Sequence, residues 1–432
     1  MILDKHLECM SREELTNYQS ELLVKLVNNV YQHCAVYAKK MDDAGVTPAD
    51  IKGVQDITKL PFTTKQDLRD NYPFGMFTAA KKDIVRVHAS SGTTGKLTTV
   101  GYTKNDIKNW AKLDARCLAM VGADENSVVH NSYGYGLFTG GLGMHYGIEE
   151  LGAMAVPCSS GNTARQLMLL KDFEADTICC TPSYCIYLSE KLGEEVKLED
   201  LKLKRAVLGA EPWSEEMRKE IEKRLHLKAY DIYGLSEIMG PGVAMECELQ
   251  DGLHINEDHF YAEILDTKTL QPVPYGEYGE LVITTLTKEG IPLIRYRTRD
   301  ITCLRKEACK CGRTFVKMER IKGRSDDMLI IRGVNVFPSQ IENVLMNVGS
   351  SIAPHYQIIV DRVNNTDTFE IQVEMSENFF SDEVKAIQQL ERKITQNMES
   401  MLGISCDITL VSPNTISRSE GKAKIIIDKR QY

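Results

Sequence analysis

Short β-branched runs alternate with helical patterns between residues 84 and 235 of this chain. Among the helical stretches, Met217, Ile221 and Leu225 recur every four residues behind Ser214, a residue type that caps helices. Strands that alternate with helices predict a doubly wound α/β fold, in which helices cover both faces of a mainly parallel sheet. The predicted strands are IVRVH (84–88), SVVH (127–130), AMAV (153–156), TICC (177–180), AVL (206–208) and AYDIY (229–233).

The pattern changes to alternating strands from about residue 253 onward. HFYAEIL, ELVITTL and LIRYRTRDIT alternate apolar with polar residues and are separated by Gly and Pro turns. They predict a smaller β subdomain over about 245–322, attached to the large N-terminal domain.

A third pattern follows residue 323. It contains a helix near 339–347, two alternating strands at 356–360 and 369–375, and a long amphipathic helix at 382–402. These elements predict a compact α+β unit.

The ends of the last helix and the domain boundary can be placed from single residues. Ser381 can cap the helix and Gly403 can end it. We expect an N-terminal domain over 1–325 and a small α+β domain over 326–432, with a hinge at about 325.

Composition narrows the class of protein. The 432 residues are 43% hydrophobic and 26% charged, which is typical of globular domains with a large core. Apolar stretches are too short for a membrane span, and the N-terminus lacks the apolar core of a secretory signal. A net charge of −9 argues against nucleic acid as a partner. Most cysteines sit in apolar runs, as in a reduced cytoplasmic protein: Cys117, Cys158, Cys179, Cys180 and Cys185.

The most specific feature is a loop directly after the first predicted strand. Its glycines let the backbone approach a polyphosphate, while hydroxyls and backbone amides donate to phosphate oxygens and a lysine adds charge. The loop is not a Walker A sequence, because Ser90 and Leu97 stand where that pattern needs Gly and Ser or Thr. The alternative is a flexible connector. The loop residues are Ser90, Ser91, Gly92, Thr93, Thr94, Gly95 and Lys96.

A second string, YDIYGLSE over 230–237, follows another predicted strand. It should lie at the carboxyl edge of the same sheet, where doubly wound folds bind ligands. There an aromatic ring can stack on a purine, and a carboxylate can hold Mg²⁺. Three further strings are weak indicators of function when taken alone: YRTRD over 296–300, GRSDD over 323–327 and SRSEGKA over 417–423.

In this order and spacing, the five strings resemble the ANL superfamily of adenylate-forming enzymes. The resemblance runs from about residue 85 to the C-terminus. The SSGTTGK loop, the GAEPW turn at 209–213, the YRTRD string and the short C-terminal domain are most similar to its phenylacetate–CoA ligase branch. Leu97 and Ser417 stand where the family commonly has proline, and neither change removes a catalytic group.

The resemblance implies a role for each motif. Lys422 would bridge the substrate carboxylate and the α-phosphate, Glu237 would ligate Mg²⁺, and Asp326 would be the pivot of a mobile C-terminal lid. The expected ATP and AMP site comprises the loop from Ser90 to Lys96 together with Gly209, Ala210, Glu211, Pro212, Asp231, Tyr233, Gly234, Ser236, Asp300 and Arg324.

The same resemblance implies the reaction. An acid is activated by ATP as an acyl-adenylate with loss of pyrophosphate, and coenzyme A then takes the acyl group while AMP departs. One rival forms the same adenylate but loads the acyl group onto the phosphopantetheine of a carrier protein. A second makes an adenylylated product, as the related deazaflavin-cofactor F390 synthetases do, and a third is a nucleotide-binding sensor. A homodimer is left open as the assembly.

The stretch NSYGYGLF over 131–138 is a candidate acyl pocket. Glycines make room and aromatics line it, which suits a flat ring on a short acid arm. The alternative is a packed turn with core aromatics. Tyr133, Gly134 and Phe138 would form the pocket, and phenylacetate is the preferred acid, with other arylacetates fitting nearly as well.

Four residues form a candidate metal site away from these motifs. Cys309 and Cys311 lie in a C-x-C-G turn, while Cys247 and His254 flank a likely turn at 250–252. Three Cys and one His can complete a tetrahedral zinc site. The alternative is four unrelated loop residues, and His259 is the substitute ligand if His254 points away.

Overall fold

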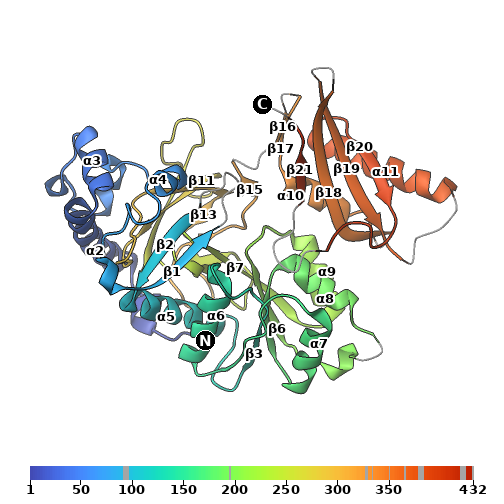
Figure 1. Cartoon of the computed structure of the whole chain (residues 1–432), viewed down its shortest axis with the longest axis horizontal. Helices are drawn as coiled ribbons and strands as arrows, with labels where there is room; N and C mark the ends of the chain where they lie inside the picture. Colours follow the sequence, from blue (N-terminus) through green and yellow to red (C-terminus); the bar gives the residue numbers. More distant parts are fainter. Residues whose placement is uncertain are drawn as a thin grey trace. The chain divides into compact units, whose positions relative to one another are not determined.

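The computed structural model describes residues 1–90, 97–193, 196–325, 329–332, 334–349, 351–363, 366–377, 384–418 and 425–430. These residues form two compact units (Figure 1). The first comprises Met1–Cys180, Val196–Ala210 and Lys228–Arg320. The second comprises Thr181–Glu195, Glu211–Leu227 and Ile321–Tyr432.

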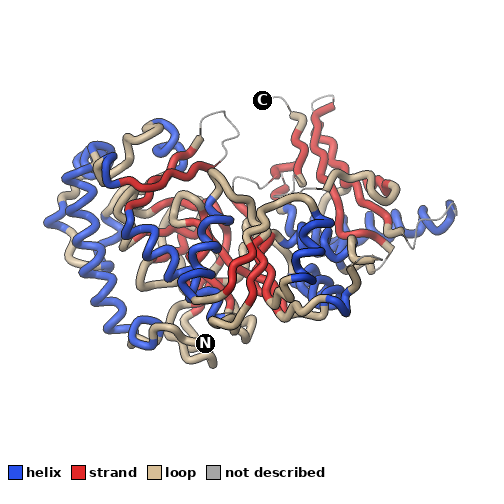
Figure 2. Tube along the Cα trace, turned by 60° about the horizontal axis from the view of Figure 1, so that its bottom comes forward, coloured by secondary structure: helices blue, strands red, loops and turns tan. Residues whose placement is uncertain are grey.

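A large mixed sheet forms the core of the first unit. Its strand order is β13-β14-β9-β8-β7-β6-β5-β3-β4, with the segment from β7 to β4 parallel and the rest antiparallel. Figure 2 shows these strands gathered centrally with helices around them. The strands are β3 (Val128–Asn131), β4 (Met154–Val156), β5 (Thr177–Cys180), β6 (Arg205–Gly209), β7 (Lys228–Leu235), β8 (Gly240–Glu246), β9 (Leu253–Ile255), β13 (Leu304–Arg305) and β14 (Lys317–Met318).

Five of the six strands expected in the parallel sheet are confirmed. The strand expected at 84–88 is present as β1 (Ile84–Ser90), but its expected place in the parallel sheet was wrong, because in the described residues it pairs with β2 (Thr98–Thr103) in a two-stranded antiparallel hairpin. A second antiparallel sheet contains β10 (Phe260–Leu265), β11 (Gly279–Thr285) and β12 (Tyr296–Thr302). Strands β9, β13 and β14 extend the large sheet, so the segment expected as one β subdomain is shared between two sheets.

Three helices of the first unit, α2, α4 and α5, begin at capping boxes. The hydroxyls of Ser11, Thr64 and Thr103 each accept an N3 amide in a capping box. The helices are α1 (Lys5–Glu8), α2 (Arg12–His33), α3 (Ala35–Asp43), α4 (Lys65–Asp70), α5 (Lys104–Met120), α6 (Thr139–Leu151) and α7 (Thr163–Asp172), with short 3₁₀ turns η1 (Pro48–Asp50), η2 (Val54–Lys59), η3 (Lys81–Asp83) and η4 (Leu198–Asp200).

Glycines allow α5 and α6 to pack closely. A Cβ atom on Gly147 would lie 2.3 Å from Cβ of Asp114, and one on Gly143 would lie 2.3 Å from the ring of Trp110. Side chains at these positions would push the two helices apart. No helix within the described ranges is long and apolar enough to cross a membrane.

The second unit has its own apolar core. Strands β18 and β19 contribute Ile358, Val360, Ile371 and Val373, and helix α11 contributes Ile394. Its sheet order is β20-β19-β18-β21. The elements are α8 (Pro182–Glu190), α9 (Glu215–Leu225), β15 (Gly323–Arg324), β16 (Leu329–Ile331), β17 (Val334–Val336), α10 (Pro338–Met346), β18 (Ile352–Val363), β19 (Thr366–Met375), α11 (Val384–Leu402), β20 (Asp407–Val411) and β21 (Ile426–Asp428).

From α10 onward, these elements match the pattern predicted for the C-terminal region, whereas α8 and α9 lie in a stretch expected in the N-terminal domain. The helix near 339–347 and the strands at 356–360 and 369–375 are confirmed. Gly403 ends α11 with φ of +71°, as expected for a helix-terminating glycine. Ser381, the predicted cap, lies outside the described residues.

Candidate active site

Two segments distant in sequence converge on Glu237, in the turn between β7 and β8. The Ser90 hydroxyl donates to Oε1 of Glu237 at 3.0 Å, and Nζ of Lys65 lies 3.1 Å from the same oxygen. Glu237 is only 4% exposed. Ser90, the described residue of the SSGTTGK string, therefore contacts the YDIYGLSE turn, and it does so from a separate hairpin rather than from a strand of the large sheet.

The surroundings of Glu237 keep its carboxylate ionised. Burial alone would raise its pKa, but the positive charge of Lys65, a backbone amide and the Ser90 hydroxyl outweigh burial and lower the pKa below its ordinary value. A buried oxygen ligand that carries a negative charge suits a hard divalent cation. Sequence analysis did not identify Lys65 as a site residue, because a lone lysine at the start of α4 has no local pattern that indicates a role.

Lys288 and Tyr102 support the turn that carries Glu237. Nζ of Lys288 donates to the carbonyls of Glu237, at 3.1 Å, and Ile238, at 2.7 Å, and lies 4.8 Å from the ring centre of Tyr102. The Tyr102 hydroxyl donates to the carbonyl of Met239 at 2.8 Å. Burial lowers the pKa of Lys288 to about 8. The sequence analysis missed both residues.

Glycine is required where β7 approaches its neighbours. A Cβ on Gly234 would lie 1.8 Å from the carbonyl oxygen of Gly240 in β8, and one on Gly209 would lie 2.3 Å from that of Ile232 in β7. Ala210 follows with φ of +72°, a left-handed conformation. The glycines of both motifs thus allow close strand packing at the edge that carries the candidate site.

Tyr233 and Asp300 form a second polar pair. The Tyr233 hydroxyl donates to Oδ2 of Asp300 at 2.6 Å, and both side chains are buried. The partners come from β7 and β12, so the YRTRD string lies beside the YDIYGLSE turn. The short bond fixes the orientation of the carboxylate, as a ligand-binding acceptor requires.

The other predicted nucleotide-binding residues differ in their surroundings. The Ser236 hydroxyl lies 2.9 Å from the Thr139 hydroxyl at the start of α6. Oδ2 of Asp231 lies 3.8 Å from Nε of Arg320. Glu211, Pro212 and Arg324 belong to the second unit. Ser91, Gly92, Thr93, Thr94, Gly95, Lys96, Asp326 and Lys422 lie outside the described residues.

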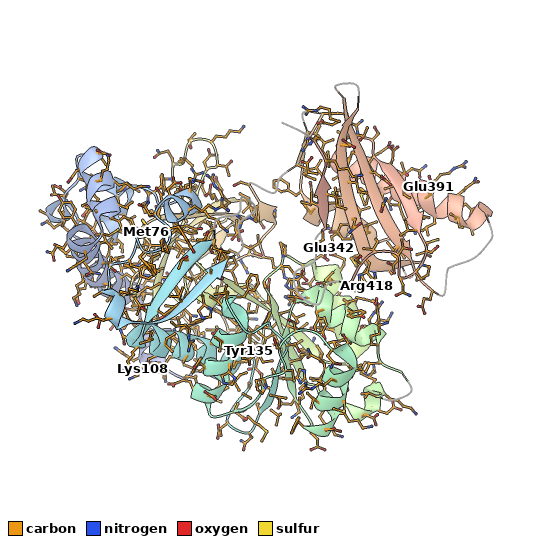
Figure 3. The ribbon with its side chains drawn as sticks, viewed as in Figure 1. Met76, Lys108, Tyr135, Glu342, Glu391 and Arg418 are labelled. Carbon is orange, nitrogen blue, oxygen red and sulfur yellow. The ribbon has the colours of Figure 1, made fainter. Side chains whose placement is uncertain are left out.

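The candidate acyl-pocket residues have contrasting environments. Tyr133 is 7% exposed and packs against Gly140, whereas Phe138, the residue before α6, is 59% exposed. The Asn131 amide donates to the hydroxyl of Tyr135 at 2.9 Å. Figure 3 labels Tyr135. Gly134 lies so close to α6 that a Cβ on Gly141 would contact its carbonyl at 2.5 Å.

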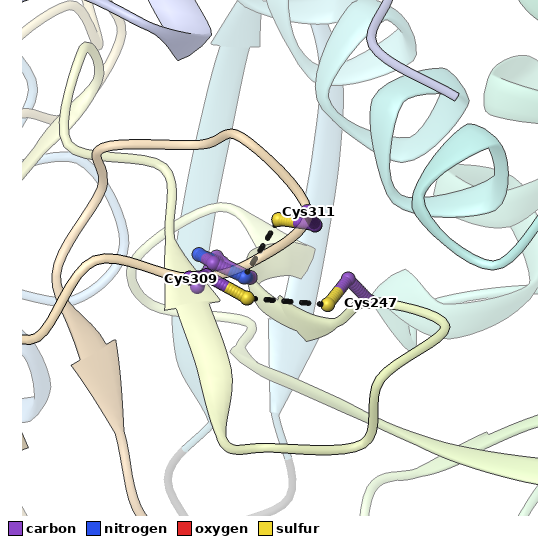
Figure 4. A group of neighbouring side chains, drawn as sticks. Cys247, Cys309 and Cys311 are labelled. Atoms are coloured by element: carbon purple, nitrogen blue, oxygen red, sulfur yellow. Dashed lines mark hydrogen bonds between the residues drawn. The ribbon is translucent and has the colours of Figure 1, made fainter.

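The candidate metal ligands converge. One potential ligand atom from each of Cys247, His254, Cys309 and Cys311 lies within 4.8 Å of the others. Figure 4 shows the three thiols facing a common centre. His259 is not part of the group, since its Nδ1 lies 2.7 Å from the Thr287 hydroxyl. His254, rather than His259, therefore lies with the three cysteines.

Comparison with known proteins identifies the family. A model of AMP-binding enzymes matches residues 18–287, and one of the AMP-binding enzyme C-terminal domain matches residues 333–430. The chain is 49% identical over 446 residues to phenylacetate-coenzyme A ligase of Thermus thermophilus, covering 100% of both chains. It is also 49% identical over 427 residues to that of Escherichia coli, covering 98% of this chain and 97% of the relative.

The chain belongs to the phenylacetate–coenzyme A ligase branch of the AMP-binding enzymes. The resemblance drawn from its motifs is confirmed.

Solved structures of this family agree in fold. Crystal structures of 2-hydroxyisobutyryl-CoA ligase match at 28% identity. The postadenylation-state complex with 2-HIB-AMP gives a TM-score of 0.92 over 98% of this chain and 91% of that chain. The thioesterification-state complex with 2-HIB-AMP and CoA gives 0.72 over 99% and 92%. The predicted fold class, a large α/β N-terminal domain followed by a small C-terminal domain, is therefore confirmed.

Proposed function

We propose that this protein is an ATP-dependent acid–CoA ligase whose preferred acid is phenylacetate. The acid and ATP form phenylacetyl-AMP and pyrophosphate, and coenzyme A then yields phenylacetyl-CoA and AMP. The observation that carries the proposal is the 46–49% identity, over 98–100% of this chain, to four phenylacetate-coenzyme A ligases. The convergence of Ser90, Lys65 and Glu237 supports it independently.

The first unit supplies groups for a bound nucleotide. Glu237 is the proposed Mg²⁺ ligand, because it is buried and held ionised by Lys65. Mg²⁺ bound there would offset the negative charge of the phosphates. We assign Asp300 to the ribose, the ring of Tyr233 to adenine and Ser236 to the neighbourhood of the α-phosphate.

The remaining nucleotide roles rest on the family resemblance. The loop from Ser90 to Lys96 would bind the β- and γ-phosphates. The turn comprising Gly209, Ala210, Glu211 and Pro212 would enclose adenine, with Asp231 and Gly234 on the adjoining strand. Arg324 would lie near the ribose.

Lys422 is the proposed catalytic lysine of adenylation. A carboxylate that attacks the α-phosphorus approaches a centre surrounded by negative oxygens, and a lysine between the two anions offsets their repulsion. We propose that residues 326–432 form a lid that turns about Asp326. Withdrawal of Lys422 would then open the site to the thiol of coenzyme A.

The acyl group is assigned to the segment containing Tyr133, Gly134 and Phe138. Its glycines and aromatic rings suit the flat ring of an arylacetate. Other arylacetates are the nearest competing substrates.

We also propose one structural Zn²⁺ at Cys247, His254, Cys309 and Cys311, separate from Mg²⁺ at Glu237. None of the twelve cysteines, all of which lie in described residues, forms a disulfide, which supports a cytoplasmic location. Monomer and homodimer are both compatible with the chemistry proposed.

The test is AMP release from Mg-ATP and coenzyme A across a panel of aryl and short aliphatic acids. The proposal predicts AMP and phenylacetyl-CoA in equal amounts, with phenylacetate giving the highest kcat/KM. Adenylate formation without a free acyl-CoA product would point to transfer to a carrier protein or another cofactor. No acid-dependent AMP would contradict the proposal.

A further inference from the structure

The four candidate metal ligands come from three segments of the first unit. Cys247 follows β8, His254 lies within β9, and Cys309 and Cys311 lie in the loop between β13 and β14. Pairing of β8 with β9, and of β9 with β14, holds the segments side by side. All but Cys311 are buried.

Two distances within the group match a tetrahedral zinc site. Zinc lies about 2.3 Å from sulfur and about 2.0–2.1 Å from nitrogen, so tetrahedral angles place two sulfurs about 3.8 Å apart and a sulfur and a nitrogen about 3.6 Å apart. Sγ of Cys247 lies 3.8 Å from Sγ of Cys309, and Sγ of Cys311 lies 3.5 Å from Nε2 of His254. Both separations fit two edges of one coordination tetrahedron (Figure 4).

The polar groups of this cluster have few other partners. His254 is 0% exposed, and its Nδ1 makes no hydrogen bond to any residue in the described ranges. A buried imidazole among three thiols, which are weak hydrogen-bond donors, is poorly satisfied without a ligand. A soft thiolate-rich set selects zinc over magnesium or calcium.

The loop carrying two of the ligands also holds the N-terminal segment. Nε of Arg313 lies 2.6 Å from Oε2 of Glu8. The Thr314 amide donates to the Glu8 carbonyl at 3.1 Å, and the Thr314 hydroxyl donates to the Met10 carbonyl at 2.6 Å. Phe315 packs with Met10 and Leu15.

Glu8 is the centre of this contact. It is 0% exposed, and its Oε1 accepts the amides of Leu3 and Asp4 at 2.9 and 2.8 Å. Arg313 therefore provides the closest opposite charge to a buried carboxylate that organises the first helical turn. Arg313 follows Cys311 by two residues, so the position of the loop determines whether the Arg313 guanidinium lies beside the Glu8 carboxylate.

We propose that zinc at Cys247, His254, Cys309 and Cys311 acts as a clasp that fastens residues 1–15 to the first unit. The clasp rests on the zinc binding proposed above. By fixing the Cys309–Cys311 turn, the ion holds Arg313 and Thr314 against Glu8 and Met10. Release of the ion frees the loop and, with it, the N-terminal segment.

The experiment compares metal content with hydrogen–deuterium exchange in full-length protein. Four proteins are purified without chelator: the wild type, the ligand variants Cys309→Ala and Cys311→Ala, and the control Cys158→Ala. Cys158 is partly exposed, like Cys311, but is not one of the four candidate zinc ligands. We expect about one zinc per chain in wild type and control, and about a tenth or less in the two ligand variants.

Exchange reports the clasp itself. Loss of zinc should speed amide exchange in residues 1–15 by about tenfold or more, while residues 384–402 of α11, in the second unit, change little. A zinc chelator added to wild type should do the same, and zinc added back should restore protection. Because this chelation experiment uses only wild-type protein, its result does not depend on how the variants fold.

Each failure has a different meaning. Wild type that takes up no zinc, even from added ZnCl₂, overturns both the site and the clasp. Zinc loss with unchanged exchange in residues 1–15 overturns the clasp and leaves the site standing. Phenylacetyl-CoA formation is measured separately, so failure of the ligase proposal cannot be mistaken for either result.

Discussion

Lys65 should control the ionisation of Glu237, and its replacement by methionine removes that control. Nζ lies 3.1 Å from a carboxylate oxygen that is otherwise buried. The lysine side chain is 34% exposed, so water screens the pair, and an effective dielectric constant between about 40 and 80 is appropriate. Their attraction is then about 1.3–2.7 kcal/mol. Loss of this attraction therefore raises the pKa of Glu237.

The sign follows from the two opposing influences on Glu237. Burial raises its pKa, and Lys65 is the strongest influence that lowers it. In Lys65→Met, protons therefore compete with Mg²⁺ for the carboxylate at higher pH than in wild type. The acidic limb of the pH–rate profile should move toward neutrality by about 1–2 units.

The assay is phenylacetate-dependent exchange of pyrophosphate into ATP at limiting Mg²⁺, from pH 5 to 8.5. Lys65→Arg retains the charge and should keep the wild-type limb. Lys82→Met removes an exposed lysine of η3 and serves as control. A Lys65→Met limb within about 0.3 units of wild type would refute this electrostatic account.

Three further predictions concern packing, nucleotide binding and pH. Gly234→Ala places a methyl 1.8 Å from a carbonyl oxygen and should lower the free energy of unfolding by about 1–3 kcal/mol in urea, whereas Gly193→Ala, with no atom within 4 Å, should not. Tyr233→Phe removes the 2.6 Å bond to Asp300 and should raise the KM for ATP about tenfold, with kcat within about threefold; an unchanged KM would contradict the role of Asp300. Burial raises the pKa of Glu342, labelled in Figure 3, to about 7. The folded protein therefore holds the proton of this carboxyl more tightly than the unfolded chain, and the stability that this proton contributes is full below the unfolded pKa and is lost as the pH rises through 7. Glu342→Gln should gain up to about 3 kcal/mol relative to wild type between pH 5 and 8 by urea unfolding, and equal pH slopes would contradict this.

The parallel part of the large sheet could be predicted because its strands are buried on both faces. TICC and AVL are continuous apolar runs, as fully covered strands require. The strand at 84–88 could not be assigned correctly, since a β-branched run reads alike in a hairpin and in a parallel sheet. Its partner, TTVGYT at 98–103, lies beyond the phosphate loop.

The candidate site could be predicted only where its functional residues lie within a short sequence motif. Glu237 and Asp300 lie in such strings, and so do Cys309 and Cys311. Lys65 and Lys288 are single lysines in a helix and a turn, and their contacts with the Glu237 turn span more than 50 residues of sequence. Such contacts follow from long-range packing, which no local pattern encodes.

The measurement that tests the central claim most directly is exchange of labelled pyrophosphate into ATP with phenylacetate and no coenzyme A. Reversible formation of phenylacetyl-AMP predicts exchange that needs both phenylacetate and Mg²⁺ and is abolished in Lys422→Ala, with ATP binding retained. Exchange that is absent without coenzyme A, or that proceeds without any acid, would contradict activation of the acid as an adenylate.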